Sequence, residues 1–281
     1  MTHLFWRKLK NDRLAMLCLL LLALIVVVGV LAPALAPHDP TLTSIRNKYQ
    51  AMSLTYPLGT DNLGRCLFSR LLFGIRTTVF YSLLAMAFTI FLGGALGLIA
   101  GYFQGRVDGV LMRACDVVLS FPGEVMIFAL VGVMGPGMNN VLLAVVLVKW
   151  AWYARTIRGV VLQHGHKNYV SFARVIAAPA GHVMRRHLLP VAAADVAILA
   201  SSDIGSVVLL LSALSFLGLG AQPPLPEWGN MLSEAKGVML THPEQMLPAG
   251  LAIAITVAAF NVVGDFLRDA FDPVYHIRNE E

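Results

Sequence analysis

Charged residues are scarce in this sequence. Asp, Glu, Lys and Arg make up 13% of its 281 residues, against about 25% in an average soluble domain. Hydrophobic residues make up 57%, so the composition argues against a soluble enzyme and favours a membrane protein. The 21 Lys and Arg residues exceed the 16 Asp and Glu residues only slightly, and this surplus does not indicate a nucleic-acid partner.

Cysteine is rare, and the motifs of catalytic and metal sites are missing. The three cysteines, Cys18, Cys66 and Cys115, lie far apart without a CxxC spacing, which gives no sign of a disulfide framework or a zinc site. The sequence has no GxxxxGK[ST] loop to hold phosphates, so the chain is not expected to hydrolyse ATP by that chemistry. We assign no catalytic residue and no metal ligand.

Long uncharged runs predict six membrane spans in an all-α integral membrane protein. The first run, within 14–37, is longer than the about 7 to 15 apolar residues of a signal peptide and can cross about 30 Å of hydrocarbon. A cleaved signal peptide is the alternative, because basic residues precede the run and Ala34-Leu35-Ala36 resembles a cleavage site. Pro37 directly after that site disfavours cleavage, so we expect an uncleaved anchor.

Glycine and proline divide the later spans. Several glycines of the second span, among them Gly93, Gly97 and Gly101, share one helix face and predict close contact with another helix. Gly135-Pro136-Gly137 splits the next apolar region into a hairpin of two spans, the first of which must begin near Arg113 to be long enough. The other predicted spans cover 77–105, 139–153, 190–220 and 247–267.

The distribution of cations predicts the orientation. Of the 21 Lys and Arg residues, 14 lie in the N-terminal tail, in the turn at 105–113, in the loop at 155–186 and in the C-terminal tail. Because cations favour the cytoplasmic side, we expect both termini and the long basic loop to be cytoplasmic. Among the outer cations, Arg65, Arg70 and Arg76 belong to a segment whose leucines share one side, which predicts an amphipathic helix on the outer surface.

The loop between the fourth and fifth spans is too long to be a simple connection, since helical hairpins need only about 2 to 8 residues. Within it, Tyr169, Phe172 and Ile176 lie on one face of a short amphipathic helix, and Pro179 and Gly181 end this helix. Such a face suits the groove of a partner protein. Lipid headgroups are the alternative, and the spacing alone does not decide between them.

The run YVSFARVIAAPAGHVMRRHLLP, residues 169–190, resembles the cytoplasmic EAA loop of permease subunits in ABC importers. Three positions depart from the usual pattern: Ser171 replaces a Glu, Phe172 a small residue and Ala177 a Gly. The resemblance implies that this loop couples the chain to ATPase subunits. The implied coupling residues are Tyr169, Val170, Ser171, Phe172, Ala173, Arg174, Ile176, Ala177 and Pro190.

Further strings narrow the resemblance to the dipeptide, oligopeptide and nickel permeases. They are LGTDNLGRCLFSRLLFGIRTT at 58–78, DVVLSFP at 116–122, SFLGLGAQPPLPEWGNML at 215–232 and FNVVGDFLRDAFDP at 260–273. Cys66 stands where this family usually has Asp. WAWYAR at 150–155 and DIG at 203–205 look more like the second nickel-type permease than the dipeptide type.

The resemblance implies a type I ABC importer permease that translocates nickel or a metal chelate across the bacterial inner membrane. A dipeptide or oligopeptide importer is the alternative. The implied partners are a homologous permease, two ATPase subunits that bind ATP and Mg²⁺, an extracytoplasmic solute-binding protein and membrane lipid, with no cofactor on this chain. The expected organisation is 1–76 before the core, a core of five spans at 77–268 with the coupling loop at 159–189, and a cytoplasmic tail at 269–281.

Four acidic residues lie within the predicted spans, where a charge is costly and marks a candidate functional site. Asp116 is expected to form a structural ion pair with Arg113 or Arg155, and Asp195 to reach water. Glu124 and Asp203 lie deeper and are candidates for the translocation path, because carboxylates suit a divalent cation. A secondary transporter, the alternative of a different class, would predict repeated halves, and the halves show no self-similarity.

Overall fold

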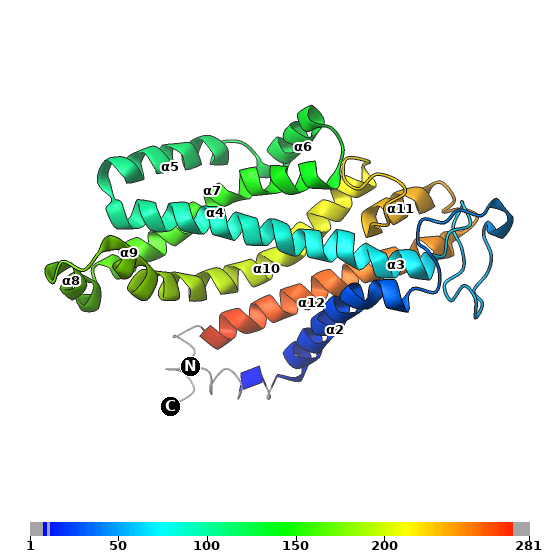
Figure 1. Cartoon of the computed structure of the whole chain (residues 1–281), viewed down its shortest axis with the longest axis horizontal. Helices are drawn as coiled ribbons and strands as arrows, with labels where there is room; N and C mark the ends of the chain where they lie inside the picture. The colour runs from blue at the N-terminus through cyan, green and yellow to red at the C-terminus, as the bar shows by residue number, and fades with distance from the viewer. Residues whose placement is uncertain (1–7, 10–11, 272–281) are drawn as a thin grey trace. The chain divides into compact units, whose positions relative to one another are not determined.

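The computed structural model describes residues 8–9 and 12–271, and these residues are almost entirely helical (Figure 1). Their extended segments form only an isolated bridge between Thr60 and Cys66. The helices are α2 (Arg13–Leu35), α3 (Leu67–Ile75), α4 (Tyr81–Phe103), α5 (Gly105–Leu119), α6 (Gly123–Met134), α7 (Met138–Gly165), α8 (Asn168–Val175), α9 (Ala180–Val183), α10 (Leu189–Phe216), α11 (Trp228–Lys236) and α12 (Leu247–Phe271).

Five helical stretches of the described residues are long and apolar enough to cross a membrane. They are Arg13–Leu35, Leu67–Phe103, Met138–Gly165, Ala180–Phe216 and Pro243–Ala270. The bent pair of α5 and α6 gives a sixth span if it is counted as one. The predicted all-α membrane fold is confirmed.

The third predicted span is wrong as a continuous helix beginning near Arg113. Helices α5 and α6 meet at a bend of 84°, and Ser120 closes α5 with a 2.7 Å hydrogen bond from its Oγ to the carbonyl of Val117. Pro122 disfavours a helical conformation at Phe121, the residue before it, and has no N–H to donate. Pro122 marks this break in the sequence. A single span was predicted nevertheless, because a membrane-crossing helix needs more residues than follow the break.

The amphipathic helix predicted between Arg65 and Arg76 forms as α3, but it does not lie separately on the membrane surface. It continues through a π-helical turn, Arg76–Phe80, into α4. Its apolar side faces protein, since a Cβ added to Gly29 of α2 would lie 2.6 Å from the side chain of Ile75. The expected boundary between residues 76 and 77 therefore falls inside one helix.

The chain divides into two compact units. Of the described residues, the first contains 8–9, 12–84, 131–142 and 201–270. One of its apolar clusters consists of Leu67, Ile75, Val79, Val208, Trp228, Met231, Ala249, Ile253 and Phe260. Trp228 anchors α11 on α3, because its ring packs over Gly74 and its Nε1 donates to the carbonyl of Leu71 at 3.0 Å. This unit includes α2, α3, α11 and α12.

Of the described residues, the second unit contains 85–130, 143–200 and 271. The glycines of α4 pack on α7 as predicted: a Cβ on Gly93 would lie 2.6 Å from the carbonyl oxygen of Trp150, and one on Gly101 would lie 2.7 Å from the side chain of Val161. Only small residues permit this approach. The expected tail at 269–281 begins within α12, and its residues 272–281 lie outside the described residues, as do Arg7 and Lys10 of the N-terminal tail.

Candidate functional site

The segment expected as the coupling loop, 159–189, is more helical than the sequence suggested. Its first residues belong to α7, which runs to Gly165, and its last ones belong to the stretch Ala180–Phe216. The part outside these two long stretches is α8 with its flanking turns. Figure 1 shows α8 as a short helix at the end of α7.

Helix α8 has one buried side and one exposed apolar side. Val170 and Ala173 are 0% and 5% exposed and hold the helix against its unit. The exposed apolar side chains are those of Tyr169 and Phe172, of Ile176 directly after the helix, and of Val175, which was not predicted. The exposed fractions are 44% for Tyr169, 65% for Phe172, 82% for Val175 and 60% for Ile176. We call these four side chains the docking face.

The backbone at the end of α8 shows why similar loops usually have Gly where this chain has Ala177. Ala177 has a φ of 53°, in the left-handed region that favours glycine, and the usual residue at this position is Gly. The N–H of Ala178 donates back to the carbonyl of Ala173 at 3.0 Å and closes the helix end. Of the other residues predicted to take part in coupling, Ser171 is exposed, and Arg174 lies in α8.

A basic groove lies next to α8 in the same unit. It has a volume of about 800 Å³ and is lined by Gly181, His182, Arg185, Arg186 and Pro190. The ring of Tyr169 on the docking face lies 5.9 Å from the ring of His187. The structure therefore brings the predicted Pro190 to a cationic surface near the docking face.

The four acidic residues of the spans have different surroundings. Asp116 forms an ion pair with Arg155, one of the two partners predicted for it. Glu124 is exposed in the first turn of α6, whereas Asp195 and Asp203 are half-buried on α10. Within 8–9 and 12–271, no three His, Cys, Asp or Glu side chains gather as possible metal ligands. Glu124 and Asp203 are therefore single candidates and not parts of a metal cluster.

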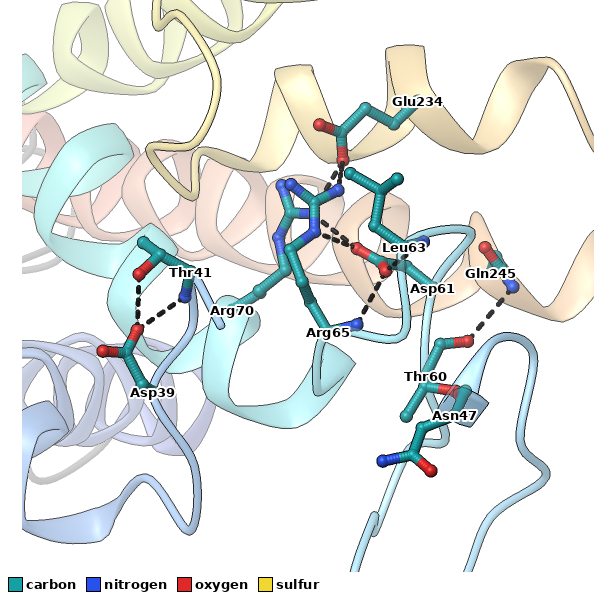
Figure 2. Close-up of polar contacts among 10 residues, drawn as sticks. All are labelled: Asp39, Thr41, Asn47, Thr60, Asp61, Leu63, Arg65, Arg70, Glu234 and Gln245. Atoms are coloured by element: carbon teal, nitrogen blue, oxygen red, sulfur yellow. Dashed lines mark hydrogen bonds and ion pairs between the residues drawn. The ribbon is translucent and has the colours of Figure 1, made fainter. Parts of the chain in front are cut away.

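The first unit contains a buried ionic clamp that the sequence did not reveal (Figure 2). Arg65 and Arg70, each 1% exposed, lie between the carboxylates of Asp61 and Glu234. Arg65 donates to Asp61 at 2.6 Å and to Glu234 at 2.7 Å. Arg70 donates to Asp61 at 2.6 Å and forms an ion pair with Glu234 at 2.8 Å. Two cations and two anions balance, which makes the burial tolerable. The arginines are structural members of the fold and not surface charges.

Glu227 is a second buried group of the first unit, with an exposure of 0%. It caps α11 by accepting from the backbone N–H of Asn230 at 2.8 Å. Its other oxygen accepts from the hydroxyls of Thr78 at 2.9 Å and Ser212 at 3.3 Å. Burial raises the pKa of Glu227 above its usual range, although the hydrogen bonds from Asn230 and Thr78 act in the opposite direction. This carboxyl joins α11 to two long helical stretches.

Apolar helices long enough to span a membrane define a polytopic membrane protein, and α8, outside these helices, exposes apolar side chains. Residues 93–276 match the family described as the binding-protein-dependent transport system inner membrane component, and residues 1–52 match the N-terminal TM domain of oligopeptide transport permease C. The chain belongs to this family of inner-membrane transport components. The family predicted from the sequence is confirmed, as is the type I permease fold.

Curated relatives are similar over nearly the whole chain. The metal-staphylopine import system permease protein CntC of Staphylococcus aureus is 42% identical over 267 residues, which cover 95% of this chain and 92% of the relative. The glutathione transport system permease protein GsiD is 38% identical over 270 residues in Pectobacterium atrosepticum and 40% identical over 276 residues in Escherichia coli. Each alignment covers 96% of this chain and 90% of the relative. The chain is thus a multi-pass permease subunit of an ABC importer.

Proposed function

We propose that this chain is the second permease of an importer that translocates nickel or a metal chelate, with ATP hydrolysed by partner subunits. It forms the pore with a homologous permease, receives its substrate from an extracytoplasmic binding protein and docks on two ATPase subunits. It binds no cofactor itself, and ATP and Mg²⁺ belong to the ATPases. The observation that carries this proposal is the docking face on α8 in a chain of this family.

The exposed side chains of the docking face give it the character of a binding site. Phe172 and Ile176 are more than half exposed, and burying such side chains contributes about 1.5 to 3 kcal/mol each. The buried residues of α8 hold it in place, so the face is presented without further ordering. A helix of this kind fits an apolar groove in a partner. The cation distribution supports a cytoplasmic position for this surface and for both termini.

The relatives favour a metal chelate over a free peptide without excluding the peptide. The relative with 42% identity is named for import of metal-staphylopine, and those with 38% and 40% identity are named for glutathione, a small peptide. Glu124 and Asp203 face the translocation path in this proposal, because carboxylates suit divalent cations and charges in a span are costly.

An uptake experiment tests the substrate. The full complex with its binding protein is reconstituted in liposomes, and ATP-driven uptake of radioactive nickel is measured with and without a small amino-acid chelator. We expect Glu124→Gln and Asp203→Asn to lower uptake while the complex still assembles. A control is Arg106→Gln, which removes an exposed charge of α5 outside the proposed path. Uptake of dipeptide but not of nickel or its chelate would favour the peptide alternative, and normal uptake in both variants would remove the two carboxylates from the path.

A further inference from the structure

Two ion pairs connect α5 to α7 in the second unit. Asp108 of α5 accepts from the Nε and Nη2 atoms of Arg158, the latter at 2.6 Å. Asp116 of α5 pairs with Arg155. The side chains of Asp108 and Arg158 are 16% and 29% exposed, whereas those of the second pair are about half exposed. The first pair is bidentate and shielded from water, so it is the stronger of the two.

Apolar packing joins the same helices to α4. Cys115, Ala151 and Ala154 are fully buried in one cluster, which also includes Leu96 of α4 and Met112 of α5. These apolar contacts hold the three helices together. The ion pairs add two polar contacts with fixed partners.

The spacing of the charges prevents α5 from sliding along α7. Arg155 and Arg158 are separated by about 4.5 Å along the axis of α7, and Asp108 and Asp116 by about 12 Å along α5, at 1.5 Å per residue. The two arginine side chains must therefore diverge to reach their partners. A shift of α5 in either direction lengthens one of the pairs, so the two pairs together fix the register.

Helix α7 leads into α8 without a slack linker. Only His166 and Lys167 separate the two helices, and both ends of this connection are hydrogen-bonded. The N–H of Lys167 donates to the carbonyl of His164 at 3.1 Å, and the carbonyl of Lys167 accepts from the N–H of Ser171 at 3.0 Å. A force on α8 is therefore applied directly to the end of α7.

At its far end, α5 passes through the 84° bend into α6, whose first turn carries Glu124. We propose that Asp108 and Arg158 are positioning residues, which transmit movement of α8 through α7 to α5 and so set the orientation of α6 and Glu124. This inference rests on the proposed function, in which ATPase subunits move α8. The movement reaches a residue that lies some forty positions before α8 in the chain.

The experiment measures coupling in the full complex in liposomes. The readouts are basal ATP hydrolysis and its stimulation by the substrate-loaded binding protein, because stimulation requires transmission through the permease and does not depend on which substrate is carried. We expect Asp108→Asn to keep basal hydrolysis within about twofold and to lower the stimulation about tenfold, the effect of about 1.4 kcal/mol. The exchange of the two charges, Asp108→Arg with Arg158→Asp, is expected to restore the stimulation.

The controls separate transmission from simple charge loss and from misfolding. Arg106→Gln removes an exposed charge from the same turn of α5 and should leave the stimulation unchanged. Asp116→Asn affects the more exposed pair and should have a smaller effect than Asp108→Asn. Full stimulation in an assembled Asp108→Asn complex would overturn the inference, as would an assembled charge-exchange complex that stays unstimulated. A complex that is stimulated by peptide but not by metal chelate would contradict the proposed substrate alone.

Discussion

At the scale of single residues, the most informative side chain is a small one. Ala177 ends α8 with a φ of 53°, and a left-handed conformation costs a non-glycine residue about 1 to 2 kcal/mol. The chain accepts this strain next to the surface that we propose to dock on the ATPases. The strain is confined to the end of α8. Its removal should therefore make local unfolding of α8 less frequent and leave the membrane spans unchanged.

The variant Ala177→Gly tests this account. Glycine removes the strain but gives the unfolded segment more freedom, so a net stabilisation of up to about 1 kcal/mol is expected. Amide hydrogen exchange within residues 168–178 should slow by up to about fivefold. The neighbouring change Ala178→Gly serves as the control, because Ala178 has no positive φ and should exchange faster as glycine. Faster exchange in Ala177→Gly would contradict the role given to this φ angle.

At the scale of elements, the ionic clamp decides how α11 is held. It connects the segment around Asp61 to α3 and, through Glu234, to α11. Helix α11 has only nine residues, too few to be stable alone. Its fixed points are Trp228, the cap at Glu227 and the clamp. Loss of one carboxylate would leave a buried guanidinium without full compensation.

We therefore expect Asp61→Asn to lower the free energy of unfolding by about 3 to 5 kcal/mol, as breaking buried ion pairs does. Unfolding of the purified permease in detergent, followed by tryptophan fluorescence, measures the change. The comparison variant is Asp116→Asn, which breaks a half-exposed pair and should cost about 0 to 1 kcal/mol. Equal effects of the two variants would show that the clamp is no stronger than a surface ion pair.

The elements also show what the sequence can and cannot predict. The spans other than the third, and the glycine face of α4, were predictable, because long apolar runs and residue spacing are local properties. The exposure of Tyr169, Phe172 and Ile176 on one face was predictable too, whereas the spacing left out Val175. The clamp was not, since Arg65 and Glu234 are 169 residues apart and nothing local distinguishes a buried arginine from an exposed one. Glu227 was overlooked for the same reason, because only the folded chain removes it from water.

At the scale of the whole molecule, the chain works only as one part of an assembly, and Phe172 is the residue on which docking should depend most. We expect Phe172→Ala to weaken binding of the ATPase subunits by about 10- to 100-fold, which corresponds to about 1.4 to 2.8 kcal/mol. Titration of purified ATPase onto the solubilised permease pair measures this affinity.

Phe103→Ala is the matched control for Phe172→Ala, since Phe103 is a phenylalanine of similar exposure, 53%, at the end of α4. Its removal should leave ATPase binding unchanged. If the Phe172→Ala permease also binds the ATPase normally but binds lipid vesicles less well, the docking face contacts the membrane surface and not the ATPase. This result would reverse the choice between the two partners that the sequence left open.

The clamp has a consequence for the order in which the protein is made. Asp61, Arg65 and Arg70 are synthesised within ten residues of one another, so both arginines can find a carboxylate while they are still emerging from the ribosome. Glu234 is synthesised more than 160 residues later, after three further candidate spans have begun to insert. The nascent chain thus carries a half-neutralised pair of arginines through most of its insertion.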